Sequence, residues 1–175
     1  MKKKNKPAVF KKVNAFLHLW LGLISGLVVF IVSLTGCLFS FQQEINEYKD
    51  HQLLFVKPPA AQTKTLSITY LNQLANSKLK GNASFITAFS NPGRSWEFMV
   101  YKPGNREAFW AVNTIETYKS VFINPYTGQV LGTKDYTKDF FILVKTIHWN
   151  LLLNDKYGQP IVGYATLIFV LLMLS

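Results

Sequence analysis

The hydrophobic residues of the chain gather in two long runs, one near each end. No Asp, Glu, Lys or Arg occurs between Phe16 and Phe39. At about 1.5 Å per helical residue, this run is about 36 Å long, enough to cross a hydrocarbon core of about 30 Å. The pattern predicts a transmembrane helix over 16–39, continued by a polar helix to about Tyr48.

The second apolar run follows Pro160 and covers 161–174. It is shorter than the roughly 17 residues that a membrane span needs, and the sequence stops inside it. We therefore expect 160–175 to be the truncated start of a second transmembrane helix, with its partner helices outside this chain. Residues 139–159 are amphipathic and aromatic, and they predict an interfacial helix and loop whose Trp149 and Tyr157 suit the headgroup layer.

The segment between the two runs, residues 40–138, has the pattern of a small α+β domain. Leu66, Leu71 and Leu74 recur at helical spacing behind Ser67, a favourable N-cap, and predict a helix over 67–78. Stretches rich in β-branched and aromatic residues, separated by turn signals, predict strands at 84–90, 96–102, 108–113, 118–124 and 129–132. The expected fold class is a membrane protein whose transmembrane α-helices flank a small extracytoplasmic α+β domain.

The net charge of +10 raises the question of nucleic-acid binding, but the distribution of charge answers it. Lysines occupy positions 2, 3, 4, 6, 11 and 12, and no acidic residue precedes the first apolar run. A short lysine-rich tail before a span indicates a cytoplasmic N-terminus, so residues 1–15 form a basic cytoplasmic tail. All nine acidic residues lie in the rest of the chain. We expect the lipid bilayer, and no nucleic acid, as a partner.

Cys37 is the single cysteine, which excludes an internal disulfide. Leu34-Thr35-Gly36-Cys37 resembles a bacterial lipoprotein processing site, where Cys37 would be lipidated and the preceding helix removed. Against that alternative, the apolar run is longer than the roughly 7–15 residues of a signal-peptide core.

Two of the three histidines lie beside the apolar runs. His18 is one turn inside the first span, where a titratable ring is costly without a partner and is a functional candidate. Gly22 and Gly26 follow on its face, leaving room for a close partner helix or for a flat macrocycle. His148 precedes the second run, so it lies near the opposite face of the bilayer. The two imidazoles, roughly 30 Å apart, cannot bind one iron together.

The third histidine, His51, follows Glu44, Glu47 and Asp50 beyond the first span. This group could contact a metal or an iron chelate, but a solvated helix end explains the pattern better. No other arrangement of residues indicates a catalytic group.

Three separated motifs resemble the PepSY-associated transmembrane family. The first is His18-Leu-Trp-Leu-Gly22 with Leu34-Thr35-Gly36, and the second is Val121-Phe-Ile-Asn-Pro-Tyr-Thr-Gly-Gln-Val-Leu-Gly132. The third combines Ile147-His148-Trp149 with Gly158-Gln-Pro-Ile-Val-Gly163. The second motif is similar to the closing hairpin of a PepSY domain, so the α+β segment is expected to be PepSY-like.

Some members of this family look like ferric-siderophore reductases of the bacterial inner membrane, with b-type haem held by histidine pairs. The resemblance implies that His18 and His148 are axial ligands of two different haems, each completed by helices outside this chain. It also implies a ferric siderophore or another iron chelate as partner of the periplasmic domain. Plausible contacts for an anionic chelate are Arg94, Arg106 and Tyr126, with the aromatic residues Tyr101, Trp110 and Tyr118.

The function predicted from this resemblance is transfer of electrons across the inner membrane to reduce periplasmic ferric chelates during iron uptake. Ferric-siderophore reductase activity is expected of a full-length protein only, and not of this segment alone. A non-enzymatic, membrane-anchored PepSY module that binds or restrains a periplasmic partner is the first alternative. A lipoprotein lipidated at Cys37 is the second.

Overall fold

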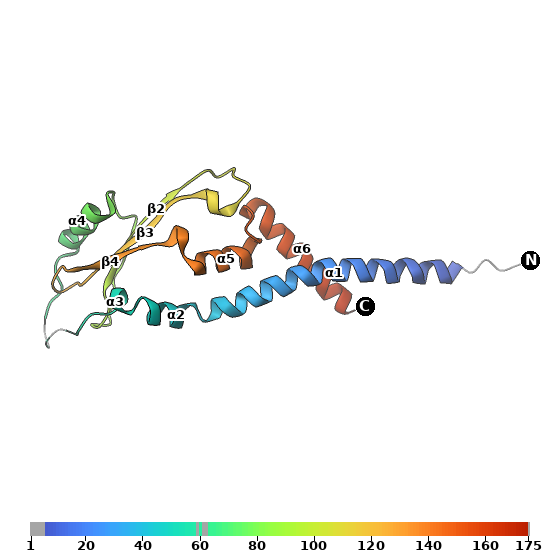
Figure 1. Cartoon of the computed structure of the whole chain (residues 1–175), viewed down its shortest axis with the longest axis horizontal. Helices are drawn as coiled ribbons and strands as arrows, with labels where there is room; N and C mark the ends of the chain where they lie inside the picture. Colours follow the sequence, from blue (N-terminus) through green and yellow to red (C-terminus); the bar gives the residue numbers. More distant parts are fainter. Residues whose placement is uncertain (1–5, 59, 61–62, 175) are drawn as a thin grey trace, which may run out of the picture. The chain divides into compact units, whose positions relative to one another are not determined.

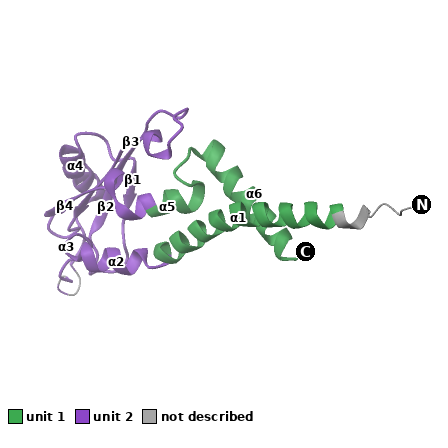
Figure 2. Ribbon diagram, turned by 45° about the vertical axis from the view of Figure 1, so that its right-hand side comes forward, with its two compact units in different colours: residues 1–39, 144–175 green, residues 40–143 purple. Residues whose placement is uncertain are grey.

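The computed structural model describes residues 6–58, 60 and 63–174, with side chains from Val9 onward. Lys2, Lys3 and Lys4 of the predicted basic tail lie outside the described residues. The chain divides into two compact units, shown in Figure 2. Unit 1 combines residues 1–39 with 144–175, and unit 2 contains residues 40–143. Each unit has its own structure and is described separately.

The main helix of unit 1 is α1, Lys6–Ser40, and it contains the predicted first span. The part from Val9 to Ser40 is long and apolar enough to cross a bilayer, and most of its side chains are exposed. Its two buried hydroxyls are satisfied within the helix. Ser25 donates to the carbonyl of Leu21 at 2.6 Å and Thr35 to that of Ile31 at 2.7 Å. Such internal bonding suits a helix in lipid, where no water can take these protons.

The second long helix of unit 1 is α6, Asp155–Met173. The apolar run was predicted to begin at Pro160, but the helix begins one turn earlier and contains this proline. The reason is an N-cap: the Asn154 side chain accepts a hydrogen bond from the Lys156 amide at 3.0 Å. With this turn the helix is about 28 Å long, close to the thickness of a hydrocarbon core. It is a second candidate membrane span.

Unit 2 is built on a four-stranded antiparallel sheet with strand order β1-β2-β3-β4. The strands are β1 Phe85–Thr87, β2 Trp96–Pro103, β3 Ile115–Ile123 and β4 Val130–Asp135. Phe98 pairs with Val121 at the centre of the sheet, and both side chains are fully buried. Because neighbouring residues of a strand point to opposite faces, Glu97 and Phe122 lie on the other side.

Helix α4, Ile68–Leu79, covers the face that carries Phe98 and Val121 (Figure 1). Ser67 caps the helix by accepting a hydrogen bond from the Tyr70 amide at 3.3 Å. Leu71 is fully buried against the sheet and belongs to the core of the unit. The helix predicted over 67–78 is confirmed within one residue at each end.

The opposite face of the sheet is covered by the short helices α2, Gln42–Lys49, and α3, His51–Leu54. Leu53 lies so close to Gly132 on β4 that a Cβ at this glycine would overlap its side chain. The Ser95 hydroxyl donates to the Leu53 carbonyl at 2.6 Å and fixes this turn beside the sheet. Phe122 is therefore buried as deeply as the residues under α4.

Residues 108–113 were predicted to be a strand, and this prediction is wrong. They form a loop with the short 3-10 helix η1, Ala111–Thr114, between β2 and β3. The loop is closed at its base, where the Gly104 amide donates to the Thr114 carbonyl at 2.8 Å. The β-like composition of this stretch reflects the exposed aromatic residues Phe109 and Trp110 and not a place in the sheet.

Candidate functional site at His148

His148 lies on α5, Phe140–Asn150, and its ring contacts α1 within unit 1. Its Nδ1 atom is 2.8 Å from the carbonyl oxygen of Val32. A carbonyl oxygen can only accept, so Nδ1 carries the proton of this hydrogen bond. In a neutral imidazole the other nitrogen, Nε2, then keeps its lone pair, which is the form that binds a metal.

The ring of His148 also lies directly against Gly36 of α1. A Cβ at this position would be 2.9 Å from Cε1 and 3.2 Å from Nδ1 of the imidazole. Carbon atoms in proteins essentially never approach so closely, so glycine at position 36 is what lets the ring reach the Val32 carbonyl. Gly36 belongs to the Leu34-Thr35-Gly36 motif, and the contact explains why the third residue of this motif is a glycine.

The chain turns sharply just after His148. Leu151 and Leu152 have φ values of 55° and 69°, a region that bulky residues rarely adopt. The side-chain amide of Asn150 donates to the Asp155 carboxylate at 2.6 Å across the turn, and Gly158 lies against the Asn150 backbone. The end of α5 is thus held beside the start of α6, which fixes the helix that carries His148.

His18 is exposed on α1. Gly22 and Gly26, predicted to share its face, lie against α6: a Cβ at Gly22 would meet Leu172 at 3.8 Å and one at Gly26 would meet Phe169 at 3.7 Å. These are ordinary packing distances, and they favour the helix-packing interpretation of the two glycines. Cys37 is exposed in the same helix, and the lipoprotein alternative stays a hypothesis.

The distance between His18 and His148 follows from α1 itself. The ring of His148 touches α1 at 32–36, which is 14–18 residues beyond His18. At about 1.5 Å per residue the two rings are separated by about 21–27 Å along this helix. One iron cannot contact both.

The acidic group around His51 is engaged by cations in unit 2. Glu47 forms an ion pair with Arg94 at 3.1 Å, and Asp50 forms one with Lys134 at 2.6 Å. His51 itself is exposed and stacks on Phe55, with ring centroids 4.7 Å apart. Within the described part of the chain, no group of three or more His, Cys, Asp or Glu side chains could hold a metal. A metal at His51 stays a prediction.

The predicted chelate contacts differ in how available their side chains are. Arg94 is held by Glu47 and lies over the ring of Phe55 at 4.6 Å, so its charge is already used inside unit 2. Arg106 is exposed in the β2–β3 loop, and Tyr126 is half-buried in the turn before β4. Of the two arginines, Arg106 is thus the more exposed to solvent.

Sequence reasoning missed a buried charge cluster centred on Lys134 of β4. Its Nζ atom lies 2.6 Å from Asp50 and 3.2 Å from Asp139, and all three side chains are largely buried. Burial by itself would lower the pKa of Lys134, but the hydrogen bond to Asp50 and the charge of Asp139 outweigh it and raise this pKa. Asp139 also accepts a hydrogen bond from the Phe141 amide at 2.8 Å, which joins the cluster to the start of α5.

A second missed feature is the pair of Tyr136 and Glu97 on the same face of the sheet. The Tyr136 hydroxyl donates to the Glu97 carboxylate at 2.8 Å. Burial, together with the charge of Glu97, raises the pKa of Tyr136 well above its usual range. The ring of Tyr118 lies 4.7 Å from that of Tyr136, and burial raises its pKa as well. No sequence signal pairs these residues, because they come from three different strands or turns.

Two helices long and apolar enough to cross a bilayer, together with a small α+β unit, fit a membrane-associated protein. The family described as PepSY-associated TM region matches residues 15–175, and the chain belongs to this family. Comparison with curated proteins gave no match. The resemblance read from the three sequence motifs is confirmed.

Proposed function

We propose that this chain is part of a b-type haem protein of the bacterial inner membrane that passes electrons to ferric chelates in the periplasm. The observation that carries the proposal is the hydrogen bond from His148 Nδ1 to the Val32 carbonyl. Histidines that bind metals commonly donate their second ring nitrogen to a carbonyl or carboxylate, which orients the ring and makes the free nitrogen more basic. His148 has this arrangement, with Nδ1 bonded to the Val32 carbonyl and Nε2 as the nitrogen that would bind the metal.

His148 would hold one haem through Nε2, and His18 would hold a second near the other face of the bilayer. Their separation of about 21–27 Å along α1 suits two carriers in sequence rather than one shared iron. The sequence contains three histidines, so the remaining axial ligands would come from membrane helices outside this chain. When bound, a haem with two histidine ligands supplies one-electron transfer without an open coordination site.

The contribution of this chain would then be ligation, spacing and orientation. Gly36 and Val32 fix the His148 ring, and α1 sets the distance to His18. With the lysine-rich N-terminus in the cytoplasm, unit 2 would lie in the periplasm, where electrons leave. There, Arg106 and Tyr126 would contact the anionic iron chelate, for example a ferric siderophore.

The test is the absorption spectrum of the full-length protein purified from haem-replete cells. We expect a Soret band that falls by about half in His18→Ala and in His148→Gln, since each residue would serve one of two haems. Glutamine can still donate to the Val32 carbonyl, so His148→Gln separates haem ligation from helix packing. The matched control is His51→Ala, an exposed position, which should leave the band unchanged. A colourless wild-type protein would overturn the proposal.

A second candidate function is a membrane-anchored PepSY module that binds a periplasmic partner without a cofactor. One observation favours it: the contacts of His148 with α1 and of Gly22 and Gly26 with α6 account for these residues as packing alone. This alternative predicts a haem-free protein in which His148→Gln changes neither colour nor partner binding.

A further inference from the structure

The structure leaves a cluster of apolar side chains exposed at one edge of unit 2. It joins two segments: the loop between β2 and β3 and the first turn of α5. Its members are Phe109, Trp110, Val112, Phe140 and Leu143, each between 43% and 56% exposed. We call this cluster the apolar edge. A soluble surface rarely gathers so many large apolar side chains without a use for them.

The two segments meet at a shallow groove of about 380 Å³. Val112 of the loop lines this groove together with Phe140 and Leu143 of α5. The Phe109 and Trp110 rings meet edge to face, 5.1 Å apart, on the same loop. Val112 thus brings the aromatic loop beside the first turn of α5, although the two segments are about thirty positions apart in the sequence.

We propose that the apolar edge docks unit 2 onto the lipid headgroup layer, with the loop Phe109–Val112 inserted among the lipids. Continuity of the chain is the first support. Phe140 and Leu143 are the last turn of unit 2, and the same helix α5 continues into unit 1, which holds both candidate membrane spans. The bilayer that surrounds those spans is therefore within reach of this turn.

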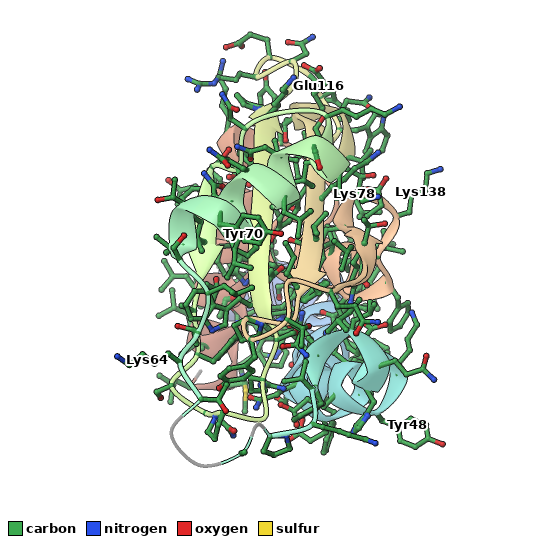
Figure 3. The ribbon with its side chains drawn as sticks, turned by 90° about the vertical axis from the view of Figure 1, so that its left-hand side faces the viewer. Tyr48, Lys64, Tyr70, Lys78, Glu116 and Lys138 are labelled. Atoms are coloured by element: carbon green, nitrogen blue, oxygen red, sulfur yellow. The ribbon has the colours of Figure 1, made fainter. Side chains whose placement is uncertain are left out.

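The chemistry of the side chains is the second support. Tryptophan and phenylalanine favour the boundary between headgroups and acyl chains, where the ring is apolar and the indole N–H can still find a partner. Lys138 borders the groove and extends outward from the fold, as Figure 3 shows, so its ammonium group can reach lipid phosphates. On the loop, Glu107 offsets the charge of the neighbouring Arg106. Because Lys138 adds a single charge beside five apolar side chains, docking should depend mainly on apolar contact and respond little to salt.

The closure of the loop is the third support. The Gly104 amide donates to the Thr114 carbonyl at 2.8 Å, and the Ala108 amide donates to the Asn105 carbonyl at 3.1 Å. These bonds tie the loop backbone down although its aromatic side chains are exposed. An exposed aromatic loop with a fixed backbone loses little conformational entropy on binding. This proposal rests on the membrane character of the chain and not on the haem proposal.

The test uses spin labels on the full chain in liposomes of phosphatidylethanolamine and phosphatidylglycerol. In a Cys37→Ser background, Val112→Cys carries the label at the apolar edge, and Ser77→Cys carries it at an exposed position of α4. Oxygen concentrates in the bilayer and a neutral nickel chelate stays in water. We expect a several-fold higher ratio of oxygen to nickel accessibility at Val112 than at Ser77, unchanged by high salt.

A label at Val112 as accessible to nickel as the one at Ser77 would overturn the proposal, because the loop would then lie in water. Low accessibility to both reagents would also overturn it, since a protein surface would then cover the apolar edge. A second variant, Phe109→Ser with Trp110→Ser, should return the Val112 label to water. These two side chains are exposed, so the circular dichroism of the chain should stay the same and show that the fold is intact.

Discussion

The imidazole of His148 and the α-carbon of Gly36 lie in direct contact, with no room for a methyl group between them. The ring can donate to the Val32 carbonyl only from this position. The contact joins α5 to α1, two helices that lie far apart in the sequence. The contact explains why position 36 is a glycine and position 148 a histidine.

Gly36→Ala should displace the His148 ring and break its hydrogen bond to Val32. In an exposed helix the change would stabilise by about 1 kcal/mol, so a loss of thermal stability in detergent would reveal the steric conflict. The matched controls are Gly22→Ala and Gly26→Ala, where the added methyl would meet α6 at 3.8 Å and 3.7 Å. Both should be tolerated. An unchanged melting temperature and an unchanged imidazole N–H resonance in Gly36→Ala would contradict the prediction.

Lys134→Met should destabilise unit 2 strongly, because it leaves Asp50 and Asp139 as neighbouring buried charges without their cation. Removing one partner of a buried ion pair typically costs about 3–5 kcal/mol. The measurement is urea unfolding of the full chain in detergent, followed by near-UV circular dichroism.

Lys119→Met is the matched control for the buried lysine. Lys119 is 52% exposed, and its ion pair with Asp135 spans 3.3 Å. A surface pair of this kind contributes at most about 1 kcal/mol. Equal losses of stability in the two variants would show that burial around Lys134 has been assigned wrongly.

The part of the fold that the sequence predicts best is the part set by local pattern. The first span and the helix behind Ser67 depend on the composition and spacing of nearby residues, and both are present. The stretch 108–113 was assigned to a strand because exposed aromatic residues have the composition of one. Local pattern cannot tell an aromatic residue that packs in a sheet from one that is exposed on a loop.

The candidate site was predictable only in part. His148 stood out because a titratable side chain beside a membrane span is unusual. Its contact with Gly36, the Lys134 cluster and the Tyr136–Glu97 pair each depend on segments brought together by folding, and no spacing in the sequence encodes them. Such contacts can be identified only once the tertiary structure is known.

The stability of unit 2 should fall as the pH rises above about 10, the range where unfolded tyrosine and lysine side chains lose their protons. Tyr118, Tyr136 and Lys134 all have a raised pKa in the folded state. Above the unfolded values the folded chain binds more protons than the unfolded chain, so the free energy of unfolding decreases with pH. Below the unfolded pKa values, Lys134 makes its full contribution to stability. These three groups therefore predict no loss of stability as the pH falls toward neutral.

Tyr136→Phe tests which group dominates the alkaline loss. Phenylalanine keeps the ring beside Tyr118 but removes the titrating hydroxyl that donates to Glu97. We expect a shallower decrease of the urea midpoint between pH 10 and pH 11, from a lower starting stability. A slope as steep as that of the wild type would assign the alkaline loss to other groups.

Gly158→Ala should disrupt the turn between α5 and α6, because a Cβ at this glycine would overlap the backbone of Asn150. A backbone cannot move aside as the end of a side chain can, so the two helices would have to separate. That separation would also release the Asn150 side-chain amide from Asp155 and shift the helix that carries His148. Gly163→Ala in the same helix is the matched control, since nothing lies within 4 Å of its added methyl. Helix propensity alone predicts that this control gains up to about 1 kcal/mol. Thermal unfolding of both variants in detergent should therefore move in opposite directions, and a common shift would mean that the close approach at Gly158 does not hold the turn.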